Sequence, residues 1–544
     1  MKSQKRTRAC EVCHGLKIKC EMPGVEGAWT ACTRCQRLGH KCVPAPAKLQ
    51  RDRIAELEAQ VEALTAALRG KGRAATASVS TESHALLTPD SSHSMVVDDT
   101  SGHSILTFID AHVSSEEQRR ALDAYSHGFK SVWCPANLST QSLEDVRGSS
   151  PLLLLTILAF PMAAESCRNS TAVANLLVKG AISLLARCVL VEGAQNQETV
   201  RALLTAAFWH RIPRGEVSSH CHQYSRLAID MAIDIGLGGP EFPGSPAVFF
   251  RRMDGHQDND SGRTWLACYA AAAMYGLNVR RPATVVWSRQ HESSLQMMAS
   301  NGRFEDRLFG HIIQLIKLCQ QVTKELEVCD LTAFHDINDM VCQQKMAILM
   351  AQFKDWKSSV PADLLDHPML RFWSNIFAVY LYEVVLHTPT NKSTFAAPHV
   401  PANLPVADFA VPQVVTTTAA EAMSHLITAC HGAILSCEDM GPAEVLAAPS
   451  MIFAPAVMYA LKTLILVFIT FNGPQSTFGA SDLISKDAVQ MRKYITKVIE
   501  LSKAVESITY IDTYWTGRIL GAASWFETWA NDYEIILRRY AENQ

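Results

Sequence analysis

Six cysteines near the amino terminus have the composition and spacing of a metal site. The first set is Cys10, Cys13 and Cys20, the second set is Cys32, Cys35 and Cys42, and both have intervals of two and then six residues. Thiolate is a soft ligand that suits zinc, and structural zinc sites are tetrahedral and closed. Two zinc ions need eight thiolate positions, so six cysteines suffice only if each set shares one sulfur. The pattern therefore predicts one compact cluster with two Zn²⁺ ions per chain.

The segment that contains these cysteines is strongly basic. Residues 1–53 hold twelve Lys and Arg against four Asp and Glu, a net charge of +8, although the whole chain carries −3. Several of these basic residues lie between or beside the cysteines, where they offset the negative charge of the thiolates. A basic end on an acidic body is typical of a nucleic-acid-binding protein with a separate effector domain. We therefore expect double-stranded DNA as a partner.

The stretch 10–42 resembles the fungal binuclear zinc-cluster transcription factors. The likeness covers all six ligand positions, both spacings and the basic segment HGLKIKC. It implies that Cys10 and Cys32 are the bridging thiolates of the DNA-binding domain. Two positions depart from the family pattern, since His14 stands where an arginine is common and Thr30 replaces the proline usual before the fourth cysteine.

The same resemblance implies how DNA is bound. A short helix after Cys13 would present Lys17 to base edges in the major groove of CGG half-sites, and Lys19 would contact a phosphate. The candidate DNA-binding residues are Lys17, Lys19, Arg34, Arg37, Lys41, Arg51 and Arg53. The implied function is a zinc-dependent, sequence-specific regulator of RNA polymerase II transcription. Such a protein acts in the nucleus, here on metabolic, secondary-metabolite or stress-response genes.

Residues 51–69 have the repeat of a short coiled coil. Apolar residues recur at gaps of 3, 4, 3 and 4 positions, which gives an a/d seam of about two heptads. The seam consists of Ile54, Leu57, Val61, Leu64 and Leu68. A helix of this length is marginal alone, but two of them bury each other's seam. We expect a parallel homodimer, and the alternative is an amphipathic helix packed on its own chain.

The rest of the chain divides by composition. Residues 1–9 form a basic arm, 43–50 a linker with two prolines, and 70–104 a linker rich in Ser and Thr that we expect to be disordered. Helical patterns follow one another across 105–544. The predicted fold class is therefore all-α, with a small zinc cluster, a dimerisation coiled coil and a large helical regulatory domain. The best strand signal is ATVVW at 283–287.

Individual helices can be placed in this regulatory domain. Ser114 and Glu117 have capping-box spacing, Ser150 precedes another helix, and apolar stripes begin at Val200 and Tyr224. Further helices are expected near 262–278, 304–328, 336–357, 362–387, 414–438, 456–471, 481–506 and 511–540. The segments SPLLLLTILAF and ETVRALLTAAFWH resemble the middle homology region of the same transcription factors. That resemblance implies a regulatory domain that in some cases senses a metabolite, so a small-molecule effector is a candidate partner.

Other functions fit the sequence less well than DNA binding. A disulfide framework would need a secretory signal, and MKSQKRTRACEV has no apolar core for one. An iron–sulfur site also uses thiolates, but the interleaved basic residues favour a DNA-facing module. The alternative function is a helical interaction scaffold whose cluster binds protein. An enzyme in the helical part is a third hypothesis, but the chain has no G-x-S-x-G, phosphate-binding glycine loop or H-E-x-x-H, so we expect no catalytic residues.

Two stretches of the helical part have a second interpretation. Met451–Phe471 is a 21-residue apolar run, long enough to cross a bilayer. Lys462 lies in its middle, which costs about 2.5–3.5 kcal/mol on insertion scales, so we expect a buried helix and no membrane partner. His220-Cys221-His222 looks like a metal triplet. On a helix, however, His220 and His222 point about 200° apart, so we expect no metal there.

Overall fold

The computed structural model describes most of the chain from residue 100 onward and part of the cysteine-rich segment. The described residues are 10, 20, 31–37, 42–43, 100–166, 170–211, 220–242, 258–300, 302–404, 411–412, 414–473, 476–478, 481, 483–508 and 515–542. They belong to two compact units, Met1–Ser94 and Met95–Gln544. We call the first the cysteine unit and the second the helical body, and describe each by itself.

The described part of the cysteine unit contains one short helix. This is α2 (Thr33–Arg37), which begins directly after Cys32. The Gln36 backbone N–H donates to the Cys32 carbonyl at 2.9 Å, so this one turn ties a ligand position to the helix. Of the α2 side chains, Cys35 is the buried one. The helix thus directs a sulfur inward and its polar side chains outward.

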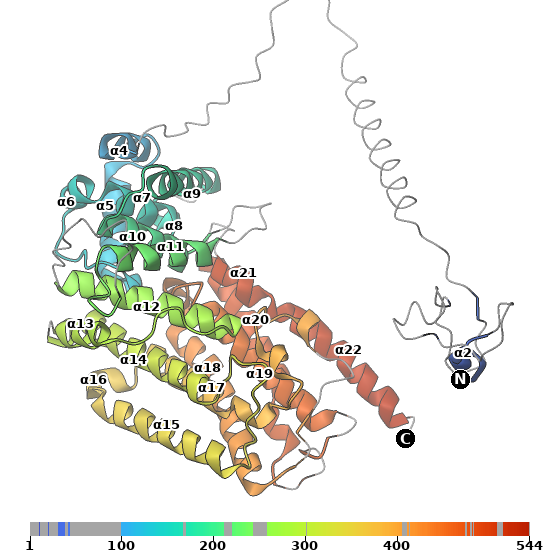
Figure 1. Ribbon diagram of the computed structural model, residues 1–544. Coiled ribbons are helices and arrows are strands. Elements are labelled where there is room, and N and C mark those ends of the chain that lie inside the picture. Colours follow the sequence, from blue (N-terminus) through green and yellow to red (C-terminus); the bar gives the residue numbers. More distant parts are fainter. Residues whose placement is uncertain are drawn as a thin grey trace, which may run out of the picture. The chain divides into compact units, whose positions relative to one another are not determined.

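The helical body is built from helices, and none of its described residues forms a strand (Figure 1). Its first half contains α4 (Gly102–Asp110), α5 (Ser115–His127), η1 (Phe129–Trp133), α6 (Leu143–Ser149), α7 (Pro151–Ala159), α8 (Ala163–Ser166), α9 (Thr171–Ala186), η2 (Arg187–Val191), α10 (Gln197–Phe208), α11 (Cys221–Asp234), α12 (Asn259–Val279), α13 (Arg289–Ser300) and α14 (Phe304–Glu325). Its second half contains α15 (Met340–Ser359), α16 (Ala362–Leu365), α17 (Pro368–Tyr382), η4 (Glu383–Leu386), η5 (Lys392–Phe395), η6 (Pro401–Asn403), α18 (Thr417–Ala447), α19 (Phe453–Asn472), η8 (Lys486–Val489), α20 (Met491–Ile508), α21 (Trp515–Gly521) and α22 (Ala523–Glu542). The all-α prediction is confirmed.

Helix starts follow the expected capping chemistry. The Ser114 hydroxyl accepts from the Glu117 N–H, and Glu117 accepts from the Ser114 N–H, so the predicted capping box is formed. Pro151 occupies the first turn of α7, where its missing N–H is not needed. The long helix α18 is interrupted at Gly441, which has a φ of +72° and precedes Pro442. Only glycine adopts this backbone conformation without strain, so the glycine at this position permits the kink.

Helix α19 lies at the centre of the helical body. It packs against α12, α17, α18, α20 and α21, and almost every side chain from Phe453 to Phe471 is buried. A helix that is apolar on all faces has to be enclosed by other helices or by lipid. The run 451–471 is thus a buried helix, and Lys462 is only 1% exposed within it.

Within the described part of the chain, three helices are long and apolar enough to span a bilayer, judged by length and composition. They are Thr171–Val191, Pro368–Leu386 and Phe453–Asn472. In the third helix, 89% of an apolar 18-residue stretch is buried inside the protein. The corresponding share is 72% in the second helix and 39% in the first. The sequence pointed to a possible membrane span only in the third helix, because polar residues interrupt the apolar runs of the other two.

The helical body differs from expectation in several segments. Helix α4 begins at Gly102, within the last residues of the span 70–104 expected to be a linker, because Ser101 caps it and Phe108 packs into the core. Helices α9 and α13 were not anticipated. The expected strand at 283–287 is instead an irregular connection, since no described segment pairs with it as a strand and Val286 is exposed.

Candidate metal centre

Four of the six cysteines converge on one point in the cysteine unit. The Sγ atoms of Cys10, Cys32, Cys35 and Cys42 all lie within 4.8 Å of one another. Cys10 Sγ is 3.9 Å from Cys32 Sγ and 3.7 Å from Cys35 Sγ. A zinc–sulfur distance of about 2.3 Å gives a tetrahedron whose edge is about 3.8 Å. These two sulfur–sulfur distances are therefore those of ligands to a single zinc ion.

Helix α2 positions two of these sulfurs. Cys32 and Cys35 are three residues apart, so one helical turn brings their side chains to the same side. Backbone N–H groups point at the sulfurs: the N–H of Cys35 donates to Cys32 Sγ at 3.4 Å, and the N–H of Cys32 donates to Cys42 Sγ at 3.3 Å. In the first set, the N–H of Cys10 donates to Cys20 Sγ at 3.4 Å. Such bonds favour thiolate, the form that binds metal.

The close packing of buried sulfurs in this site favours binding of a cation. Burial raises the pKa of the Cys35 thiol, and hydrogen bonds from the neighbouring sulfurs of Cys32, Cys10 and Cys42 raise it further. Burial also raises the pKa of the Cys42 thiol. Several thiolates cannot be packed this closely without a positive charge among them. A divalent ion supplies that charge and displaces the protons, so metal affinity rises with pH.

The comparisons with known proteins agree with this geometry. A family model described as the fungal Zn(2)-Cys(6) binuclear cluster domain matches residues 8–52. These residues form a fungal zinc-cluster domain. The domain binds two zinc ions and DNA, and it belongs to transcription regulators. No curated protein and no solved structure matches the chain. The match covers only the zinc-cluster domain, so the resemblance of the helical body to a middle homology region stays a prediction.

The described sulfurs show one of the two ligand sets that sulfur sharing predicts. The four convergent sulfurs combine all three cysteines of the second set with Cys10 from the first. The complementary ligand set would be Cys10, Cys13, Cys20 and Cys32, of which Cys13 lies outside the described residues. Because Cys10 already touches Cys32 and Cys35, its position fits a bridging thiolate.

The predicted DNA contacts are described in part. Arg34 and Arg37 lie on α2, three residues apart, and both are exposed. They are therefore neighbours on one helix face beside the cluster, a suitable position for phosphate contacts. Lys17, Lys19, Lys41, Arg51 and Arg53 lie outside the described residues. So do the predicted coiled-coil residues Ile54, Leu57, Val61, Leu64 and Leu68, and homodimerisation stays a prediction.

The histidine-rich triplet of the helical body has other partners. His220 is the residue before α11, and its Nδ1 is 2.6 Å from Gln223 Oε1. The His222 ring stacks on Tyr275 with centroids 5.5 Å apart. Among the described residues, the four cysteines are the only group of three or more potential ligands close enough to hold a metal ion.

Proposed function

We propose that the protein is a nuclear, sequence-specific transcription factor that binds CGG half-sites as a homodimer. In this proposal the zinc-cluster domain binds DNA, and the helix at 51–69 pairs two chains and sets the spacing of the half-sites. The helical body regulates DNA binding and transcription, with a small-molecule effector as its ligand. The target genes would be metabolic, secondary-metabolite or stress-response genes.

The observation that supports this proposal most is the thiol tetrad beside a basic helix. The tetrad has zinc-like sulfur distances, and α2 carries exposed arginines next to it. In this proposal zinc folds a small basic surface, which suits the phosphate-lined groove of duplex DNA. The family match points the same way, towards transcription regulation rather than catalysis.

The test is selection of binding sites from random duplex DNA with the full-length protein. We expect enrichment of paired CGG triplets. Lys17→Ala should relax the preference at one base pair and weaken binding to the selected site by about 1–3 kcal/mol. Lys19→Ala is the matched control, because loss of a phosphate contact should weaken all sequences alike.

Three outcomes would count against the proposal. Enrichment of no sequence, with zinc bound, would favour a scaffold whose cluster binds protein. Enrichment of single triplets with a monomeric complex would remove the dimer. An unchanged preference in the Lys17→Ala variant would show that another side chain reads the bases.

A further inference from the structure

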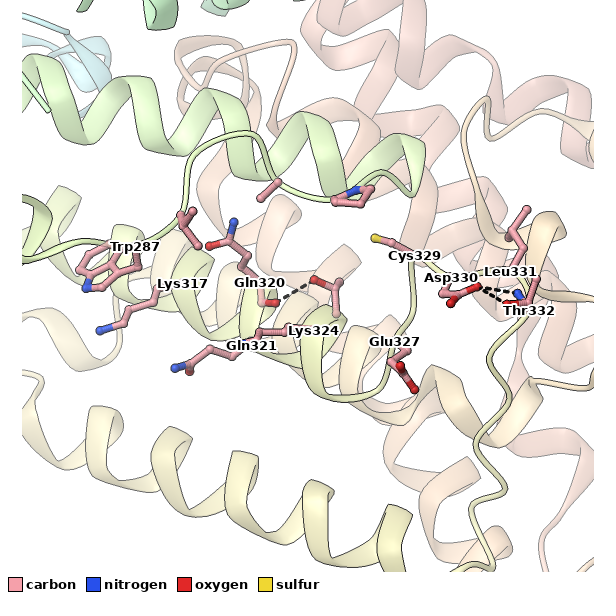
Figure 2. A pocket seen from close by; sticks show the side chains of 14 residues that line it. Trp287, Lys317, Gln320, Gln321, Lys324, Glu327, Cys329, Asp330, Leu331 and Thr332 are labelled. Carbon is pink, nitrogen blue, oxygen red and sulfur yellow. Dashed lines mark hydrogen bonds between the residues drawn. The ribbon is translucent and has the colours of Figure 1, made fainter. Parts of the chain in front are cut away.

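A large cavity opens on the helical body, and none of the zinc-binding or DNA-binding residues named above lines it. It lies between the connection 282–287, the second half of α14 and the loop 327–332, and its volume is about 820 Å³ (Figure 2). Small-molecule sites typically have volumes of about 300–1,000 Å³. In Figure 2, Trp287 and Lys317 lie at one end, Leu331 and Thr332 lie at the other, and α14 runs between them.

The loop side of the cavity is held in place by a buried lysine. Lys392 is 5% exposed, and its Nζ donates to the backbone carbonyls of Glu327, Asp330 and Ala333 at 2.8, 2.5 and 2.7 Å. Three charge-assisted hydrogen bonds from one ammonium fix the path of the loop. This wall is therefore present before any ligand binds.

The opposite side is tied to the same framework. Gln320 on α14 donates from Nε2 to the Val285 carbonyl at 3.4 Å, and Cys329 Sγ lies 3.5 Å from the Arg281 carbonyl. The first contact joins the connection to the floor helix, and the second joins it to the loop. A pre-formed site of this kind loses little conformational entropy on binding.

The cavity exposes apolar side chains to water. Val286 is 68% exposed and Leu331 is 53% exposed, and both line it together with Pro282 and Ala283. Apolar side chains gathered in a concave site are typical of a ligand-binding groove. The body of the ligand should therefore be apolar.

The cavity is lined by two lysines and two acids, and it is the lysines that offer a site for an anionic group. Its two acids are already engaged: Glu327 bonds to His335 at 2.9 Å, and Asp330 accepts from the N–H and hydroxyl of Thr332 at 2.8 and 2.7 Å. Lys324, exposed on the floor helix, makes no ion pair with any residue that the structure describes.

A second lysine lies two turns earlier on the same helix face. Lys317 Nζ is 4.3 Å from the centre of the Trp287 ring and 3.7 Å from Glu292, so its charge is only loosely compensated. Residues seven apart share a face of a helix. The floor of the cavity thus presents two ammonium groups to a ligand, and no motif in the sequence pointed to them.

We infer that this cavity binds a small organic acid, with its apolar body against Val286 and Leu331 and its carboxylate at Lys324. Lys317 and the Trp287 ring would bind the far end of a longer ligand. Binding needs only the helical body, whereas a role for this acid as the effector rests on the proposed function.

The test is isothermal titration calorimetry on the full-length protein without DNA. The probes are 2-naphthoate, cinnamate and decanoate, each paired with its neutral amide. We expect at least one acid to bind about tenfold or more tightly than its amide, as befits one charge-assisted contact. Absence of an acid-selective pair at probe concentrations up to about 1 mM would overturn the inference.

Matched variants locate the site. Leu331→Asp should weaken acid binding by about tenfold or more, whereas Leu331→Asn, of nearly the same size, should have a much smaller effect. Lys324→Gln should also remove the acid preference, and Lys503→Gln, an exposed lysine on α20, should not. Acid-selective binding that survives both Leu331→Asp and Lys324→Gln lies elsewhere and refutes this site.

A DNA readout separates this inference from the proposed function. If the acid binds as expected but leaves DNA affinity and reporter transcription unchanged, the cavity is a ligand site and the effector role is wrong. If the protein selects no DNA sequence and yet binds the acid, the proposed function fails and the ligand site stands.

Discussion

The two units of this protein are stabilised by different means. Among the described residues of the cysteine unit, the buried cluster consists of Cys10, Cys32 and Cys35, with Cys20 and Cys42 packed against it. The helical body instead has a continuous apolar core that runs from α4 to α22. The described part of the first unit thus has sulfur ligands where a small domain would otherwise need an apolar core, and we expect this unit to depend on metal ligation. The second is stabilised by burial of this apolar core.

The two units should therefore respond to different perturbations. Metal removal should act on the cysteine unit alone, and changes to buried charges should act on the helical body alone. Unfolding of the helical body on metal removal, or loss of zinc when a buried charge of the helical body is changed, would contradict this difference between the units.

The largest effect is expected from loss of Cys32, which the family resemblance implies is a bridging thiolate. Cys32→Ala should reduce bound zinc from two ions per chain to one or none and abolish specific DNA binding, because structural zinc contributes about 10–16 kcal/mol to folding of such units. Zinc content by mass spectrometry and DNA binding measure this, and Cys221→Ala is the control. The thermal transition of the helical body should not move in either variant; a large shift would mean that the units depend on each other.

The next effect concerns a buried ion pair of the helical body. Arg263 pairs with Asp306 and donates to the carbonyls of Ser131, Val132 and Cys134, and it is 3% exposed. Arg263→Met should lower the free energy of unfolding by about 3–5 kcal/mol, because the buried carboxylate of Asp306 and three backbone carbonyls lose the guanidinium that pairs with them. Urea unfolding measures this.

Two controls accompany the Arg263 variant. Arg289→Met removes an arginine whose side chain is 97% exposed, and stability should change by less than about 0.5 kcal/mol. Combining Arg263→Met with Asp306→Leu should recover part of the loss. Zinc content should stay at two ions throughout, and loss of zinc would break the separation of the units.

Smaller changes in the free energy of unfolding are expected at two buried lysines, and the two changes should have opposite signs. Burial lowers the pKa of Lys462 to about 8. Among the residues that the structure describes, its Nζ has one hydrogen-bond partner, the Ala396 carbonyl at the long distance of 3.4 Å. Lys462→Met should raise the free energy of unfolding at pH 7 by about 1–3 kcal/mol, since it removes a buried charge. Lys392→Met should lower it by a similar amount, because three carbonyls lose their donor.

The pH dependence sharpens the Lys462 prediction. Between pH 8 and the ordinary lysine pKa of 10.5, the folded protein binds fewer protons at Lys462 than the unfolded chain does. The stability of the wild type therefore gains from this lysine as the pH rises through that window. The gain should be absent from Lys462→Met, as measured by urea unfolding across the window. A variant that retains the full gain would contradict the assignment.

The smallest effect is expected on the surface of α2. Arg34→Gln and Arg37→Gln should each reduce the slope of log affinity against log salt by about 0.9, and weaken all DNA sequences by about 1 kcal/mol or less. Filter binding at several salt concentrations measures this. Lys503→Gln on the helical body is the control, and an equal change there would remove the special role of α2.

Much of the candidate site was predictable from the sequence because its information is local. Metal ligation requires particular side chains at particular intervals, so the six cysteines and their two spacings were sufficient to predict the zinc site. The buried helix around Lys462 and the capping box at Ser114 were predictable for the same reason. Each depends on residues within a few turns of one another.

The missed helices depend on distant contacts. In α9, Gly180 lies against the Phe108 ring, where a Cβ would come within 2.5 Å of a ring carbon. That glycine weakens the helical pattern in the sequence but permits the packing of α4. In α13, His291 takes a core position between Trp265 and Trp287, with centroids 4.9 and 5.0 Å away. Burial lowers its pKa to about 3, so a residue that appears polar in the sequence packs as a neutral ring.

The metal and the helical class could be predicted from the amino-acid order, because ligand chemistry and helical periodicity are properties of neighbouring residues. Two features required the folded chain: Cys10 joins the second set of cysteines, and the connection at 282–287 faces Lys324 across a cavity. Both depend on segments far apart in the chain, and packing rather than local preference brings them together.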